Sequence, residues 1–274
     1  MPVFETPGPV SLHVRLSSGR VVVTTHDELR TQVELVPLGR RGREAVADVA
    51  VTADERAGRH VVTIEQEDRI RWGPLRISLG SVEVRIACPR GADLDLTGGS
   101  TDLWVEGELG TVRVRTASGD VHLDRVRGEL EARTASGDVR VRETAGETSL
   151  LSVSGDLSVA AHSSSLTART VSGDVAVGTV RAPLTVGTTS GEVELEAVEA
   201  GEVRVQTVSG DVRIGVAGGT RVWIDAASVS GELASELDVE DTPPAEAPGT
   251  AVPVYVKTVS GDVALTRATL SSRA

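Results

Sequence analysis

A serine, a glycine and an acidic residue recur together eight times in this 274-residue chain. The first copy lies within "TASGDVHLDRV", from residue 116, and the last within "TVSGDVALTRA", from residue 258. Serine hydroxyls and carboxylates are groups that serve nucleophilic catalysis, acid–base catalysis and the binding of hard cations. The first question is therefore whether these residues react, bind a metal or shape the backbone.

The copies follow a regular period. Their serines lie at 118, 136, 154, 172, 190, 209, 230 and 260, so four intervals of 18 residues are followed by 19, 21 and 30. Self-similarity at a fixed period is the signature of a repeat architecture. The candidate site residues, all predicted to be structural repeat corners, are Ser118, Gly119, Asp120, Ser136, Gly137, Asp138, Ser154, Gly155, Asp156, Ser172, Gly173, Asp174, Ser190, Gly191, Glu192, Ser209, Gly210, Asp211, Ser230, Gly231, Glu232, Ser260, Gly261 and Asp262.

Calcium is the metal that a column of these carboxylates would suit. It takes about six to eight oxygen ligands, and calcium-binding β-roll repeats are shorter than this repeat. One acidic residue in each 18-residue period does not supply that many ligands. Adjacent carboxylates about 5 Å apart repel by only roughly 1 kcal/mol in water. We therefore predict no metal and no other cofactor.

The chemistry needed for catalysis is also sparse. Ser-Gly-Asp is not the Gly-x-Ser-x-Gly turn of hydrolases, and the five histidines share no motif. An enzyme that acts on sugars would use aromatic side chains, but the chain has one tyrosine, Tyr255, and one phenylalanine, Phe4. We predict no catalytic residue and no enzyme. A polysaccharide-acting β-helix enzyme is kept as a remote alternative.

The segments that position the motif alternate between apolar and polar residues. Leu130, Ala132 and Thr134 precede one copy, and Val139 and Val141 follow it, with charged residues between them. Period-2 alternation predicts strands with one buried face. Strands that recur every 18 residues leave no room for crossover helices. The sequence therefore predicts an all-β protein, a parallel β-helix (solenoid) with about 18 residues per coil.

The motif itself interrupts this alternation, which predicts a turn. Its glycine would allow a positive φ or a close approach of the backbone. Its acidic residue would accept hydrogen bonds from the N–H groups of the turn.

The two parts of the chain differ in regularity. Residues 1–95 read as irregular β starting coils and an N-terminal cap, in which 37–46 form an exposed loop. Residues 96–274 read as regular coils, interrupted by an exposed Pro- and Glu-rich loop at about 236–252. One continuous domain is expected. Because open solenoid ends leave strand edges unpaired, we expect an unknown protein partner or self-association through the solenoid ends.

The composition limits partners and location. Forty acidic residues against 28 basic ones give a net charge of −12, which opposes binding to nucleic acid. No apolar run approaches the roughly 20 residues of a membrane helix, so no membrane insertion is expected. The N-terminal residues lack a signal-peptide pattern, and Cys88 is the single cysteine. These features predict a cytoplasmic protein.

Several stretches together resemble a known family. The opening "MPVFETPGPVSLHVRLSSGRVVV", the repeated "TVSGDV", the later "GTRVWIDAASVSGEL" and the closing "VKTVSGDVALTR" resemble the bacterial putative-adhesin β-strand-repeat family, a domain family of unknown function. The resemblance covers nearly the whole chain. It implies a right-handed, single-stranded β-helix and a cell-surface, adhesin-like module. A surface location would require an export route that the sequence does not reveal. Our first expectation is a non-catalytic scaffold or interaction protein.

Overall fold

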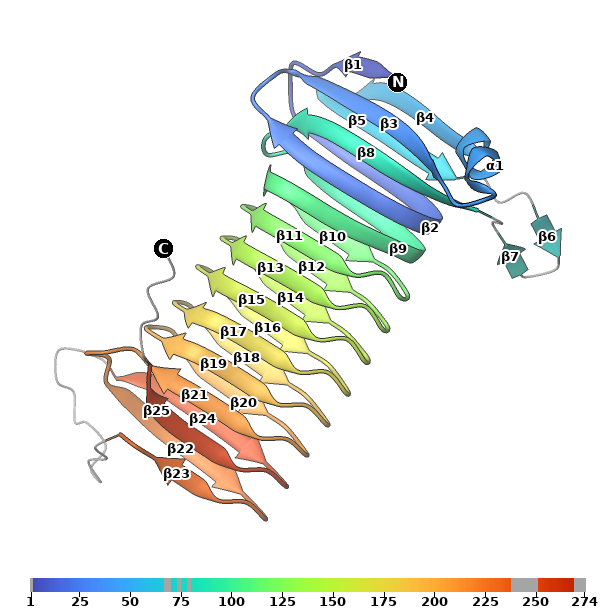
Figure 1. Ribbon diagram of the computed structural model, residues 1–274. Coiled ribbons are helices and arrows are strands. Elements are labelled where there is room, and N and C mark those ends of the chain that lie inside the picture. The colour runs from blue at the N-terminus through green and yellow to red at the C-terminus, as the bar shows by residue number, and fades with distance from the viewer. Residues whose placement is uncertain (1, 67–69, 73–74, 78–79, 238–250, 269–274) are drawn as a thin grey trace. The chain divides into compact units, whose positions relative to one another are not determined.

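The computed structural model describes residues 2–66, 70–72, 75–77, 80–237 and 251–268 (Figure 1). The chain forms two compact units, Met1–Val141 and Arg142–Ala274. In both units the strands of neighbouring coils pair in parallel, at offsets that match the repeat. The predicted all-β parallel β-helix is confirmed.

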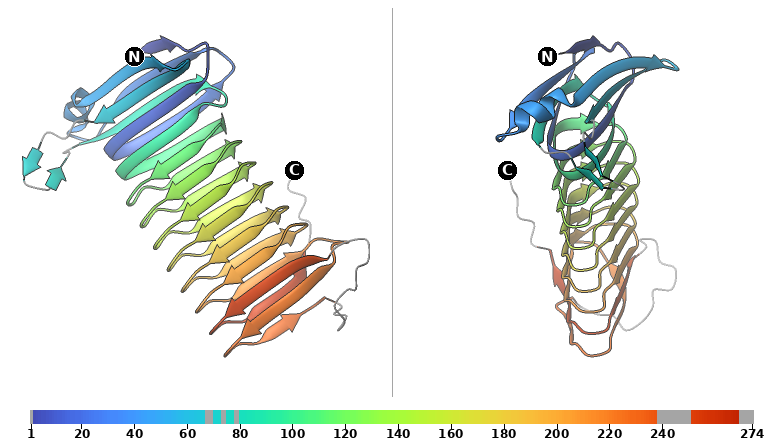
Figure 2. Two further views of the ribbon diagram at one scale, coloured as in Figure 1. Left: turned by 180° about the vertical axis from the view of Figure 1, so that it is seen from behind. Right: turned by 90° about the vertical axis from the view of Figure 1, so that its right-hand side faces the viewer.

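Each regular coil contains one shorter and one longer strand, joined by the motif turn (Figure 2). β16 (Leu166–Arg169) buries Leu166 and Ala168 and turns Thr167 and Arg169 outward, as alternation requires. The other strands of the second unit are β14 (Thr148–Leu151), β15 (Leu157–His162), β17 (Val175–Val180), β18 (Leu184–Gly187), β19 (Val193–Val198), β20 (Val203–Gln206), β21 (Val212–Val216), β22 (Val222–Ser228), β23 (Leu233–Ser235), β24 (Val252–Thr258) and β25 (Val263–Arg267).

The core consists of apolar files that run from coil to coil. In the second unit Leu166 pairs with Leu184, which in turn pairs with Val203, and all three are buried. Burying one such side chain stabilises the fold by about 1.5–3 kcal/mol. Because every coil adds several of these side chains, the files are the main source of stability.

One file contains an unexpected histidine. In β15 the inward positions are Leu157, Val159 and His162, and His162 pairs with Val180 of the next coil. His162 is fully buried; its Nδ1 lies 2.8 Å from the Ser164 carbonyl oxygen. Its Nε2 has no hydrogen-bond partner among the described residues. Burial lowers the pKa of His162 below 6.5, although the bond to Ser164 opposes this shift.

We therefore expect His162→Val to reduce the loss of stability in acid. Protonation of His162 favours the unfolded chain, so its effect is absent above about pH 6.5 and grows as the pH falls towards the folded-state pKa. Between pH 6.5 and 5 wild type should lose up to about 2 kcal/mol more than the variant. Urea denaturation at a series of pH values measures the difference. The exposed His13→Val is the matched control for the removal of an imidazole.

In the first unit, the order of coils in space differs from their order in sequence. β2 (Val10–His26) lies between β9 (Asp93–Leu109) on one edge and β5 (Arg59–Gln66) with β8 (Ser81–Pro89) on the other, in parallel throughout. The coil made by β5 and β8 thus lies outside β2, although it follows β2 in the chain. Regular coils continue from β9 with β10 (Val112–Arg115), β11 (Val121–Val126), β12 (Leu130–Arg133) and β13 (Val139–Thr144), which crosses the boundary at Val141.

Antiparallel strands cover the outer edges of β5 and β8. β3 (Arg30–Leu38) pairs with β8, and β4 (Val49–Arg56) pairs with β5. β1 (Val3–Glu5) pairs with β3. Between β3 and β4 the chain forms the six-residue helix α1 (Gly42–Ala47). The prediction that 37–46 form a loop throughout is therefore wrong for the residues of this helix. β6 (Ile70–Trp72) and β7 (Leu75–Ile77) form a separate antiparallel pair.

The second unit also departs from sequence order. β24 pairs in parallel with β20 on one edge and with β22 on the other. β25 likewise lies between β21 and β23. The last coil in the sequence is therefore inserted between two earlier ones, and the coil of β22 and β23 is outermost (Figure 1). Most of the loop predicted at 236–252 lies outside the described residues.

Candidate functional site: the corner ladder and the terminal coil

The motif glycines lie where neighbouring coils approach closely. A Cβ on Gly119 would lie 1.8 Å from the Thr101 carbonyl oxygen, and one on Gly137 would lie 1.9 Å from that of Gly119. In the second unit the same atom on Gly173, Gly191, Gly210, Gly261 or Gly231 would lie 2.0–2.2 Å from the carbonyl oxygen of the neighbouring motif glycine. Of the motif glycines, all of them described, only Gly210 has a positive φ, at 153°. Close backbone approach therefore explains the glycine.

A hydroxyl three residues before the glycine completes the turn. The N–H of Gly137 donates to Thr134 Oγ1 at 2.9 Å, and that of Gly155 donates to Ser152 Oγ at 2.8 Å. The turn at Gly210 differs, because its N–H donates to the Ser260 carbonyl oxygen at 3.1 Å. The buried hydroxyl of Thr207, three residues before Gly210, has no partner among the described residues, and neither has that of Thr258.

All eight motif serines are exposed at these turns. Their backbone takes part in the stacking: Ser118 N–H donates to the Gly99 carbonyl oxygen at 3.1 Å, and Ser172 N–H to that of Val153 at 2.9 Å. Their positions are Ser118, Ser136, Ser154, Ser172, Ser190, Ser209, Ser230 and Ser260.

The motif aspartates form a ladder of hydrogen bonds to the backbone. In the first unit Oδ1 of Asp102, which lies 18 residues before Asp120, accepts the N–H of Asp120 at 3.2 Å, and Asp120 Oδ1 accepts that of Asp138 at 3.0 Å. In the second unit Asp156 accepts from Asp174, Asp174 from Glu192, Asp211 from Asp262, and Asp262 from Glu232, at 2.8–3.0 Å. Each of these accepting aspartates thus bonds the backbone of the next coil in space, even where the sequence order is interrupted.

The two glutamates of the motif lie where the ladder stops. Glu192 has a longer side chain, and its Oε2 lies 2.6 Å from Nη1 of Arg213, a side chain of the next coil, instead of accepting a backbone N–H. Glu232 is on the outermost coil of the described residues, so no further N–H follows it. Aspartate therefore stands where the carboxylate accepts a backbone N–H of the next coil.

We expect Asp174→Ala to destabilise the second unit by about 1 kcal/mol, because the N–H of Glu192 loses its acceptor. Glu192→Ala is the matched control. It removes only an ion pair whose partners are both more than half exposed, so its effect should stay within about 0.5 kcal/mol. Urea denaturation compares the two. Equal losses would show that the ladder contributes nothing beyond surface charge.

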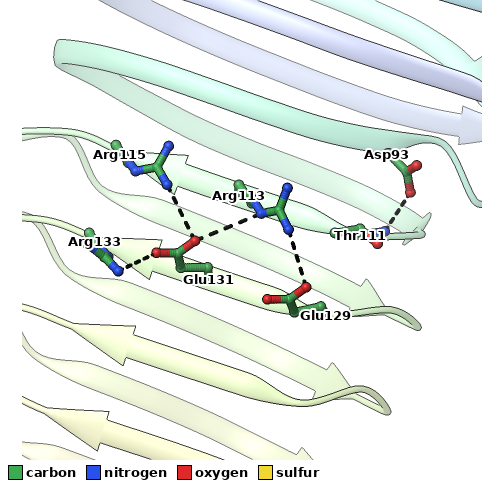
Figure 3. A network of polar contacts seen from close by, with 7 residues as sticks. All are labelled: Asp93, Thr111, Arg113, Arg115, Glu129, Glu131 and Arg133. Carbon is green, nitrogen blue, oxygen red and sulfur yellow. Dashed lines mark hydrogen bonds and ion pairs between the residues drawn. The ribbon is translucent and has the colours of Figure 1, made fainter.

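Outward side chains form ion-pair networks across the coils. In the first unit Glu131 lies 2.6 Å from Arg133, 3.5 Å from Arg115 and 3.9 Å from Arg113 (Figure 3). Arg113 also lies 3.4 Å from Glu129. Exposed pairs of this kind contribute about 0–1 kcal/mol each. The outward carboxylates here are balanced by neighbouring guanidinium groups.

The terminal coil of β22 and β23 is the least buried part of the described core. Its inward side chains continue the files of the coil beneath: Ile224 pairs with Val254 and Leu233 with Val263. Val254 and Val263 are fully buried, whereas Leu233 is 55% exposed and Ile224 is partly exposed. Trp223 and Val229 are exposed beside them. This coil thus exposes apolar side chains at positions where the neighbouring coils bury theirs.

An open groove of about 510 Å³ follows the corner in the second unit. Arg169, Gln206 and Lys257 line one part of it and the exposed Val208 and Val259 another. No group of three or more His, Cys, Asp or Glu side chains that could hold a metal occurs in the described part of the chain.

Two further groups with shifted pKa values, His122 and Cys88, lie in the first unit. Trp104 stacks on His122 with ring centroids 3.8 Å apart. Burial, and next the charge of Arg140, lower the pKa of His122. Burial raises the pKa of the Cys88 thiol to about 12, which makes this cysteine a weak nucleophile. No helix within the described ranges is long and apolar enough to span a membrane.

Comparison with known proteins identifies the family. The chain matches Toastrack DUF4097 over residues 10–182 and again over residues 145–266. A crystal structure described as a "putative cell adhesion protein" from Clostridium sporogenes is 10% identical, with a TM-score of 0.28, and the match covers 97% of this chain and 98% of that one. No curated protein matches. The resemblance seen in the sequence is confirmed: the chain belongs to the Toastrack family, DUF4097.

Proposed function

We propose that the chain is a non-catalytic β-helical scaffold that binds protein partners through its strand surfaces. The observation that carries this proposal is the corner ladder. The repeated carboxylates, which are the strongest candidates for chemistry in the sequence, accept hydrogen bonds from the backbone of the next coil. Carboxylates that are bonded in this way stabilise the stack of coils. The recurring motif therefore extends the strand surfaces of the β-helix, which are the surfaces proposed to bind partners.

The terminal coil supports the binding part of the proposal. Exposed apolar side chains next to an unpaired strand edge are typical of protein interaction sites. A photo-crosslinking amino acid at Ala227, on the exposed side of β22, should give a protein adduct in the native cell. The same amino acid at Arg140, on the exposed side of a regular coil, is the control. Equal labelling at both positions would contradict a terminal binding surface.

A catalytic role predicts a different outcome. Purified chain would be incubated with a panel of polysaccharides, and Asp174→Ala and Glu192→Ala would be tested in parallel. We expect no turnover. Turnover that follows the chain through purification and is lost in a motif variant would overturn the scaffold proposal.

The proposed location is the cytoplasm, and the competing role is an adhesin-like module at the cell surface. Cell fractionation and protease treatment of intact cells separate the two. Chain that is recovered in the cytoplasmic fraction and protected from protease supports the scaffold. Chain that is accessible on intact cells supports the adhesin-like role.

A further inference from the structure

Among the described residues, the coil of β22 and β23 has one paired edge and one free edge. β22 pairs with β24 and β23 with β25; within residues 142–237 and 251–268 neither strand has a second partner. A free edge presents unpaired N–H and C=O groups that can bond another strand. Resting on the proposed scaffold function, we propose that two copies of the chain associate through these terminal coils as a two-fold dimer.

The apolar surface supplies the driving force. Leu233 is 55% exposed, and it stands directly over the buried Val263. A second layer of strands over Leu233 and Ile224 would complete the files in the way that β24 and β25 complete those of β20 and β21. The edge also lacks usual protection against pairing, since β22 and β23 contain no lysine or proline and only one charged residue, Asp225.

The geometry selects a second copy over a peptide. One coil offers two strand edges with apolar side chains between them, and an extended peptide can pair with only one edge. Another terminal coil supplies two strands with the same spacing and the same apolar content. The first unit offers no comparable open coil in its described ranges, because β4 and β3 already pair with the outer edges of β5 and β8. The terminal coil of one copy therefore pairs with the terminal coil of a second copy. Because each copy uses its open coil in this contact, association stops at a dimer.

Two-fold symmetry makes β22 antiparallel to β22 of the second copy. A register centred on Ala226 places Asp225 opposite Ala227 of the second copy, and Trp223 opposite Val229. The same arrangement of β23 places Glu236 opposite Ala234 of the second copy. A register centred on Asp225 would instead oppose two carboxylates, which is unfavourable. This register thus keeps the carboxylates of the two copies apart and brings apolar side chains together.

Light scattering coupled to size-exclusion chromatography tests the association. The measured mass of wild type should be twice the 28.5 kDa mass of the chain. A dilution series should show dissociation to the monomer and give the dissociation constant. Leu233→Lys should weaken the dimer at least 100-fold, because it places charge in the apolar interface. The control is Val171→Lys, at a residue that is 46% exposed on a regular coil and should leave the dimer unchanged. Thermal melting of each monomer checks that the fold is retained.

A disulfide tests the register. Because Cys88 is buried, Ala226→Cys introduces a single accessible thiol, and this variant should oxidise to a covalent dimer. Ala176→Cys, on a regular coil, should remain monomeric. A wild-type chain that stays monomeric at all concentrations, a ladder of higher oligomers, or equal oxidation of both variants would overturn the dimer. A different protein crosslinked at the terminal coil of a monomeric chain would overturn self-association but leave the scaffold function standing.

Discussion

Gly173→Ala should lower the free energy of unfolding by about 3 kcal/mol or more. The new methyl group would lie 2.1 Å from the Gly155 carbonyl oxygen, well inside van der Waals contact. That oxygen belongs to the backbone of the neighbouring coil and cannot rotate away, so the coils must separate at the corner. Overpacking of this kind costs typically 1–3 kcal/mol and more where backbone must move. Urea denaturation and thermal melting give the loss.

Gly187→Ala is the matched control for this prediction. Gly187 belongs to the next coil of the same unit, and the atom nearest to a Cβ placed on it would be the flexible Arg169 Cγ, at 3.6 Å. Because alanine also restricts the unfolded chain, this variant should be neutral or more stable by about 0.5 kcal/mol. Similar losses at both positions would mean that strand propensity, and not close approach, explains the motif glycine.

Val256→Asp should detach both of the outer coils of the second unit. Val256 is fully buried and lies between Val205 and Ala226, so its replacement places a carboxylate in an apolar file. Burying an unpaired charge costs several kcal/mol. Since β22 pairs only with β24 among the described strands, its amides should lose protection from hydrogen exchange together with those of β24. The amides of β16 to β19 should remain protected.

Val259→Asp is the control on the same coil, because Val259 is 49% exposed. It should leave hydrogen exchange in β22 and β24 close to that of wild type. If β22 stayed protected in Val256→Asp, the inserted position of β24 would be wrong. Exchange measured by mass spectrometry on overlapping peptides resolves these strands.

The repeat determined most of the fold that could be predicted. An 18-residue period with alternating apolar residues predicts parallel strands, and pairs such as Val175 with Val193 confirm them. The motif also predicts a turn, whose glycines and carboxylates the structure places at the contacts between coils. A turn pattern alone does not reveal that the bonded N–H belongs to the next coil. An aspartate that accepts a hydrogen bond from an N–H of its own turn would give the same pattern in the sequence.

The order of the outer coils could not be deduced from the pattern. Val254 fits beside Val203 as well as beside Ile224, since all three occupy the same inward position. A weaker signal was present: Ala226 and Ser228 are small for core positions, which suits an outermost coil. His162 could have been placed from the sequence. It lies 18 residues before Val180, so the repeat period puts both residues in the same buried file.

The inserted coil also has a consequence for synthesis of the chain. β22 and β23 leave the ribosome before β24 and β25, yet their hydrogen-bonding partners are made last. Until then, the nascent chain must either keep a vacant slot beside β20 or dock β22 there and later exchange it. Translation that stops early would thus yield a product with an unfilled slot, which a protease could recognise as unfinished.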